Sequence, residues 1–80
     1  MTIPDRVNAR WIATLGDAQL IRAEKLLHTT FRTHEVAEKS RKGARYALLQ
    51  GPPDLITAWH RWLMVNNETR TRGLLVNRPR

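Results

Sequence analysis

Helix-breaking residues are few in this chain, and their positions constrain the fold more than any other feature of the sequence. Glycine and proline each occur four times in 80 residues, and no strong breaker stands between Gly16 and Gly43. The clearest boundary is Gly51-Pro52-Pro53, which ends one segment and, with Asp54 in the first turn, starts another. Apolar residues at helical spacing fill the stretches between the breakers, and this pattern predicts an all-α protein.

Four helical segments fit these boundaries. The first is predicted over residues 4–15, with Thr2 as its N-cap and Pro4 at its first position. Asp17 is expected to cap the second helix, and Pro53 to begin the last one. The inner face of the second helix is expected to carry Leu20, Leu27 and Phe31.

The stretch between Asp17 and Gln50 leaves two alternatives open. At about 100° per residue, Val36 falls nearly opposite the expected inner face, so one straight helix would bury two opposite faces. A break around the sequence TTFRT, with Thr33 as the next N-cap and Glu35 in the first turn, removes this conflict and is the favoured interpretation. A single long helix shared between two subunits removes it as well.

The expected architecture is a single domain over residues 1–80, a small bundle of three to four short helices, with a helix-turn-helix-like arrangement as one form of it. Residues 73–80 are expected to be a loose basic tail with a turn at Gly73. The last helix is apolar around most of its circumference, which indicates a central position or a face shared with a second copy. The tryptophans are mainly expected in the core, and a homodimer is predicted through a surface that contains Trp59, Trp62, Met64 and Val65.

Charge is distributed unevenly along the chain. Residues 1–38 contain five Lys or Arg and five Asp or Glu, whereas residues 39–80 contain nine and two, which accounts for the whole net charge of +7. Such an asymmetry favours a polyanionic partner, most often nucleic acid. The candidate nucleic-acid-binding residues are Lys39, Arg41, Lys42, Arg45, Arg70 and Arg72.

The cluster between Lys39 and Arg45 has a purely structural interpretation too. Glu35 precedes Lys39 by four residues, and Glu38 precedes Lys42 by four, so both lysines can form helical ion pairs. Arg41 and Arg45 are then the cations of this segment that are expected to be free for phosphate.

The stretch EVAEKSRKGARYALLQGPPDLITAW, about 25 residues, resembles the DNA-reading part of tetracycline-repressor-type regulators. The resemblance implies Val36 and Ala37 in the core of a first helix, Tyr46 facing the DNA backbone, and Asp54 with Leu55 at the start of the next helix. The chain departs from the pattern because it lacks the glycine-containing piece of the turn and has Leu49 where an aromatic residue is expected.

Several classes of protein are disfavoured by what the sequence lacks. The chain has no cysteine, and its histidines show no metal-ligand spacing, so neither a metal site nor a cofactor is expected. The sequence contains neither a nucleophile paired with a base nor a glycine-rich phosphate loop. Neither an enzyme nor a small-molecule substrate is therefore expected. Without a secretory signal or an apolar span, the expected location is cytoplasmic, with no membrane partner.

These observations predict a small basic DNA-binding regulatory protein without catalytic activity. DNA is preferred to RNA because the aromatic residues that could stack on single-stranded bases are expected in the core. The alternative is an adaptor or inhibitor that docks on an acidic protein surface, with Trp59 and Met64 as anchors. A third possibility is that the charge serves solubility alone.

Overall fold

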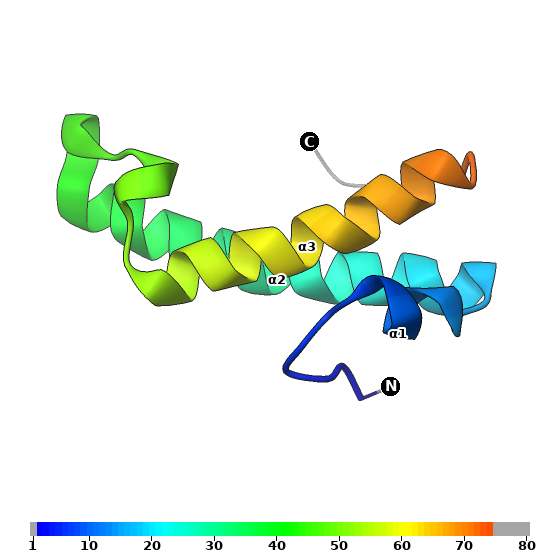
Figure 1. The fold of residues 1–80 in the computed structure, drawn as a ribbon. Helices are drawn as coiled ribbons and strands as arrows, with labels where there is room; N and C mark the ends of the chain where they lie inside the picture. The colour runs from blue at the N-terminus through cyan, green and yellow to red at the C-terminus, as the bar shows by residue number, and fades with distance from the viewer. Residues whose placement is uncertain (1, 75–80) are drawn as a thin grey trace.

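The computed structural model describes residues 2–74 and contains no strand within that range. The elements are α1 (Ala9–Ala13), α2 (Asp17–Lys42), the 3-10 turns η1 (Gly43–Arg45) and η2 (Leu48–Gln50), and α3 (Pro53–Thr71). The prediction of an all-α protein is therefore confirmed. The two long helices, α2 and α3, lie side by side in opposite directions, with α1 against one end of the pair (Figure 1). This hairpin makes the molecule elongated, with extents of 39 × 27 × 21 Å.

Residues 17–42 form one helix of 26 residues, so the expected break around TTFRT is wrong. Thr33 is not an N-cap, because its hydroxyl donates to the carbonyl oxygen of Thr29 one turn earlier, at 2.9 Å. Within the single chain the phase conflict needs no break, and a long helix shared between two subunits stays a prediction. The inner face buries Leu20, Leu27 and Phe31 as predicted, while Val36 on the other side is left 51% exposed.

The first helix is shorter than predicted, because it begins at Ala9 rather than at residue 4. Asn8 is the N-cap, and its side-chain oxygen accepts a hydrogen bond from the backbone nitrogen of Trp11 at 2.9 Å. The segment that contains Pro4 is not helical, and the guanidinium of Arg61 in α3 donates to the Pro4 carbonyl at 2.9 Å. A cap closer to the apolar residues thus replaces the one expected at Thr2.

The second helix is capped by Gly16, with Asp17 as its first helical residue rather than its cap. The backbone nitrogen of Gly16 donates to the side-chain oxygen of Gln19 at 3.0 Å. Asp17 lies in the first turn, where a carboxylate interacts favourably with the positive end of the helix dipole.

The expected continuation of a helix to Gln50 is also wrong. α2 ends at Lys42, and its C-cap Gly43 has φ +57°, a backbone conformation that costs glycine little. Two 3-10 turns follow in place of a recognition helix. The helix-turn-helix implied by the resemblance is therefore not seen in this segment, and Val36 and Ala37 are exposed rather than in a core.

The boundaries of α3 agree with the sequence. Pro53 begins the helix, Asp54 lies in its first turn, and Leu55 is fully buried. The predicted turn at Gly73 is confirmed by its φ of +69° and by the bond from the Leu74 nitrogen to the Thr69 carbonyl, 2.9 Å, typical of a Schellman ending. Residues 75–80 of the predicted basic tail lie outside the described residues.

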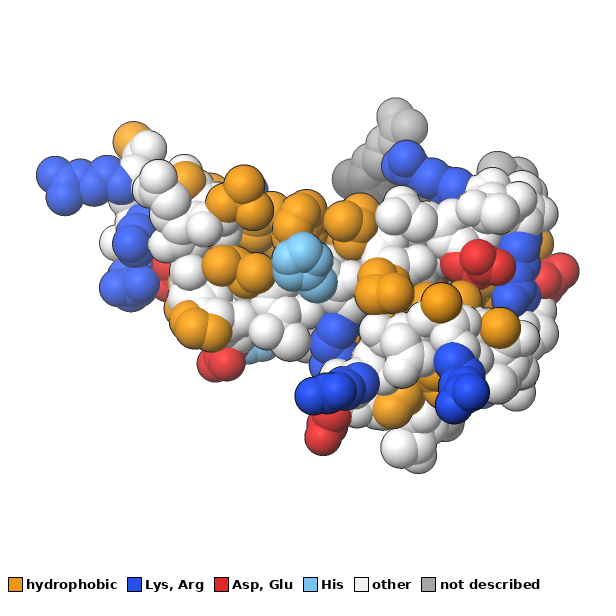
Figure 2. All heavy atoms as spheres, in the orientation of Figure 1, with side chains coloured by type: hydrophobic (Ala, Val, Ile, Leu, Met, Phe, Trp, Pro, Cys, Tyr) orange, Lys and Arg blue, Asp and Glu red, His pale blue; other side chains and the backbone are white. Residues whose placement is uncertain are grey.

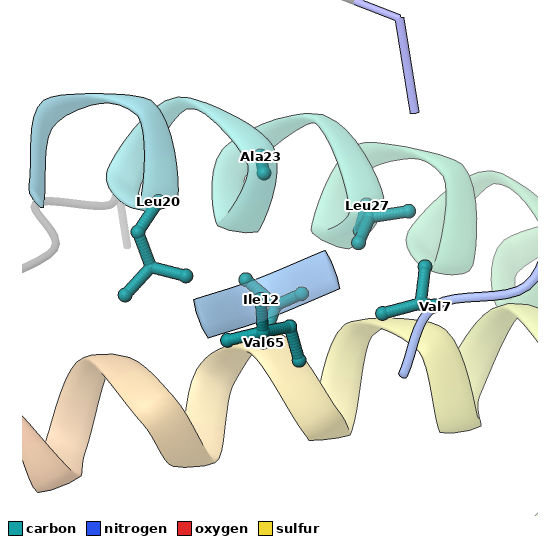
Figure 3. Close-up of a cluster of buried hydrophobic side chains, with 6 residues drawn as sticks. All are labelled: Val7, Ile12, Leu20, Ala23, Leu27 and Val65. Atoms are coloured by element: carbon teal, nitrogen blue, oxygen red, sulfur yellow. The ribbon is translucent and has the colours of Figure 1, made fainter. Parts of the chain in front are cut away.

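The core consists of two apolar clusters along the hairpin. Figure 3 shows the first, in which side chains of α2 point toward α3 while α1 and the segment before it contribute from the side. Its buried members are Val7, Ile12, Leu20, Ala23, Leu27 and Val65. The second contains Phe31, Leu55 and Ala58. Trp62 packs against both clusters, and its ring stacks on Phe31 with centroids 5.6 Å apart.

Candidate nucleic-acid interface

Four of the predicted basic residues lie together where α2 ends and η1 follows, and all four are exposed: Lys39, Arg41, Lys42 and Arg45. Figure 2 shows Lys and Arg side chains gathered at this end of the hairpin. The expected pairing is only partly right, because Glu38 binds Arg41 at 2.8 Å rather than Lys42. Arg41 is therefore not the free cation that its spacing suggested. Lys42 and Arg45 have no ion-pair partner among residues 2–74.

Glu35 organises the charges beside this end. Its carboxylate accepts hydrogen bonds from Arg32 and, at 3.0 Å, from the Tyr46 hydroxyl, and it lies 3.8 Å from the Lys39 ammonium, which confirms the predicted Glu35–Lys39 pair. The ammonium of Lys39 is also 5.3 Å from the centroid of the Tyr46 ring. Partial burial, and then the hydrogen bond to Glu35, raise the pKa of Tyr46 above its ordinary value. These contacts attach the chain after α2 to the side of that helix.

Arg70 and Arg72 lie at the opposite end of the hairpin from this cluster. Arg72 binds Asp17, the first residue of α2, at 3.1 Å, whereas Lys42 is the last residue of that helix. At 1.5 Å per residue the two ends are about 37 Å apart. The six predicted residues therefore do not form one continuous patch.

The guanidinium of Arg72 is engaged in contacts within the protein. Its guanidinium donates to the Leu15 carbonyl at 2.9 Å and to the carboxylate of Glu68 at 2.9 Å, in addition to Asp17. These carboxylates raise the pKa of Arg72, through the hydrogen bond to Glu68 first. Its side chain is only 21% exposed, so its contacts support a clamp between the helix ends rather than a phosphate contact.

The continuity of α2 creates a second arrangement of cations that the sequence reasoning missed. Lys25, Arg32 and Lys39 recur every seven residues and therefore lie within about 40° of one another around one helix. All three are exposed, as are Arg22 and Lys42, which extend the series at either end. We call these five residues the α2 row. At about 100° per residue Arg22 and Lys42 lie about 160° apart, so the row crosses α2 obliquely. Arg22, Lys25 and Arg32 lie on the side away from the buried residues, whereas Lys42 lies beyond the last buried residue, on the side that those residues occupy.

The signal for the α2 row was present in the sequence as a seven-residue repeat of cations. It was missed because the helix was expected to break between Arg32 and Thr33, which separates Lys25 from Lys39. Counting charge by halves of the chain hid it further, since Arg22, Lys25 and Arg32 belong to the half with no net charge.

The residues predicted for a dimer interface do not share an exposed surface. Val65 is fully buried in the first core cluster, so it is unavailable to a second copy. The indole nitrogen of Trp62 points inward and donates to Glu24 at 2.5 Å. Trp59 is half-buried beside His60, with ring centroids 4.8 Å apart, and Met64 is 39% exposed.

The surroundings of His28 change its protonation behaviour. Partial burial and the nearby Arg32 guanidinium lower the pKa of His28 below its ordinary value of 6.5, and Glu35 offsets part of that shift. Residues 2–74 contain no group of three or more His, Cys, Asp or Glu side chains that could hold a metal ion. None of the helices in the described range has the length and apolar character needed to cross a bilayer.

Comparisons with known proteins add no relative to this picture: family models, curated proteins and solved structures gave no match to the chain.

Proposed function

We propose that this protein binds nucleic acid, with duplex DNA as the preferred ligand, through the α2 row. The observation that carries the proposal is the exposure of five cations along one unbroken helix. Between Arg22 and Lys42 the row extends about 30 Å at 1.5 Å per residue. Cations spread along a rigid helix can contact successive phosphates of a nucleic-acid backbone.

The charge of the α2 row is only partly neutralised by the protein's own acids. Glu35 is shared by Arg32 and Lys39, while Arg22, Lys25 and Lys42 have no ion-pair partner within the described residues. The side chains of Arg32 and Lys39 remain 47% and 51% exposed despite their pairing. Because only the Glu35 side of these pairs is largely buried, at 14% exposure, phosphate can still approach both cations from solvent.

Duplex DNA is preferred because the large aromatic side chains are committed to packing. Trp62 is held between the two core clusters, and Phe31 is buried. Proteins that bind single strands or RNA loops stack bases on exposed aromatic rings. Binding to the phosphate backbone of a duplex needs cations rather than aromatic rings.

Binding can be tested by fluorescence anisotropy with a labelled duplex over a series of salt concentrations. The row variant is Lys25→Ala with Arg32→Ala, and the matched control is Arg10→Ala with Arg70→Ala, which removes the same charge from exposed positions elsewhere. We expect the row variant to reduce the slope of log affinity against log salt by about 0.9 for each phosphate that the protein no longer neutralises, and the control to leave the slope nearly unchanged. Equal reductions in the two variants, or no binding by the wild type at low salt, would contradict the proposal.

A docking function on an acidic protein is the second candidate, and the exposed Met64 is the observation that favours it. Met64 is a flexible apolar side chain of the kind used as an anchor at adaptable interfaces. If a protein partner is the true ligand, Met64→Ala should weaken its binding more than the row variant does. For DNA we expect the opposite order.

A further inference from the structure

A groove lies between the segment before α1 and the outer side of α3, away from the α2 row. The residues of α3 that line the groove are spaced three and four apart, so they lie on one side of that helix. The volume of the groove is about 380 Å³. The lining residues are Asp5, Arg6, Val7, Asn8, Thr57, His60, Arg61 and Met64.

Arg61 is the feature that distinguishes this groove from an ordinary surface hollow. One terminal nitrogen of its guanidinium donates to the Pro4 carbonyl at 2.9 Å, which holds the N-terminal segment against α3. Its Nε is buried and has no hydrogen-bond partner among the described residues. Because this Nε is closed to solvent, a ligand in the groove contacts Arg61 through the rest of its guanidinium, which the bond to Pro4 holds in place.

The other polar groups of the groove are mainly donors. Arg6 adds a second guanidinium, His60 an imidazole and Thr57 a hydroxyl, and all three side chains are exposed. The side-chain oxygen of Asn8 is used by the helix cap, which leaves its amide nitrogen as a donor. Asp5 is the one carboxylate in the lining, so two guanidinium groups outweigh it.

We infer that this groove binds a small molecule bearing a phosphate group. Several donors that approach from two separate chain segments suit a tetrahedral oxyanion, whose oxygens point in different directions, better than a planar carboxylate. The groove has the volume of a small-molecule site and exceeds what a bare phosphate ion occupies, so a phosphate monoester of a small sugar fits the available space. The inference does not depend on DNA binding by the α2 row.

Binding can be measured by NMR, with inorganic phosphate and ribose 5-phosphate as probes and acetate at equal ionic strength as the control. We expect saturable shifts confined to residues 5–8 and 57–64, together with a shift of the Arg61 Nε–H resonance, and tighter binding of ribose 5-phosphate than of inorganic phosphate. Shifts that acetate reproduces, or that spread along the α2 row, would overturn the inference.

Variants separate a local site from a general attraction to positive charge. Arg61→Lys keeps the charge but removes the planar guanidinium and its forked N–H donors, and we expect it to weaken phosphate binding at least 10-fold. Because that change can also release the Pro4 contact, Arg6→Gln is the second variant: its side chain is exposed and forms no hydrogen bond within residues 2–74. Arg6→Gln should also weaken binding, whereas the row variant Lys25→Ala with Arg32→Ala should bind phosphate as the wild type does. An unchanged affinity in Arg6→Gln, or an equal decrease in the row variant, would count against the site.

A 5′-phosphorylated oligonucleotide that competes with ribose 5-phosphate in the row variant would identify a nucleic-acid end as the source of the phosphate.

Discussion

Glu24 shows how a single side chain can determine the packing around it. It is fully buried on the inner face of α2, where its carboxyl accepts a hydrogen bond from the Trp62 indole. A buried polar group needs such a partner, because its desolvation is otherwise uncompensated. The hydrogen bond therefore sets the orientation of Trp62, whose ring then covers Phe31 and His28.

Replacing Trp62 by Phe should therefore destabilise the protein more than the smaller ring area alone would. We expect a decrease in stability of about 1.5–3 kcal/mol from the broken hydrogen bond to a buried carboxyl, which lowers Tm by roughly 4–8 °C per kcal/mol in a domain of this size. Trp59→Phe is the control, because it makes a similar change of ring and no hydrogen bond from Trp59 is present in the described range. Thermal unfolding that gives equal decreases for the two variants would show that the hydrogen bond contributes little.

His28 should make the folded protein less stable at acid pH. Its lowered pKa means that the folded state favours the neutral imidazole, while the unfolded chain takes up a proton near the ordinary value of 6.5. Stability is thus fully retained above 6.5 and falls as pH decreases toward the folded-state pKa. We expect Tm to fall between pH 7.5 and pH 5.5 in the wild type, and the fall to be smaller in His28→Gln. Parallel curves for the two proteins would assign the pH dependence to other groups.

At the scale of the element, α2 shows that an apolar residue out of phase need not be buried. Val36 is simply exposed, and the threonines around it donate their hydroxyls to carbonyls one turn earlier in the same helix. The helix is stabilised by the face that packs on α3, and its opposite face can vary. A helix of this length then aligns cations that a broken helix would have separated.

The sign of the change in unfolding free energy caused by one substitution distinguishes one continuous helix from two. In a continuous helix Thr33 is an interior residue, and Thr33→Ala should increase the free energy of unfolding by up to about 0.7 kcal/mol, because alanine has the higher helix propensity. If Thr33 were an N-cap, the same change would cost about 1 kcal/mol. Thr30→Ala is the matched control, since its hydroxyl is bonded in the same way at 3.2 Å to Leu26. Urea unfolding of the two variants should give gains of the same sign.

The parts of the fold that the sequence predicted are those set by local chemistry. Pro53 and Asp54 mark the start of α3, and Gly73 marks the turn after it, because backbone restrictions act at those positions whatever the surroundings. The start of α1 and the continuity of α2 depend on which apolar residues find partners in the folded chain. The phase of Val36 could not reveal that it stays exposed, and the α2 row could not be recognised without the continuous helix that carries it.

At the scale of the whole molecule, the hairpin places its cations in separate regions. Figure 2 shows basic side chains at the end near η1 and, separately, over the N-terminal segment and the other end of the hairpin. A charge asymmetry along the sequence therefore does not become a single patch in space. Arg72 is used to join the ends of α1, α2 and α3, while the α2 row runs along the molecule's long dimension of 39 Å.

The length of the α2 row predicts the length of duplex that it can engage. About 30 Å of helix, at 1.5 Å per residue, matches roughly nine base pairs at 3.4 Å each. With hairpin DNAs whose stems increase from six to fifteen base pairs, we expect affinity to rise up to about nine pairs and to change little per site beyond that. Replacing Arg22 and Lys25 by Ala removes one end of the row, and the plateau should then be reached with a shorter stem, because fewer phosphates are contacted. Arg10→Ala with Arg70→Ala should leave the plateau where it is. If affinity is the same for six and twelve pairs, the protein contacts DNA at a point rather than along α2.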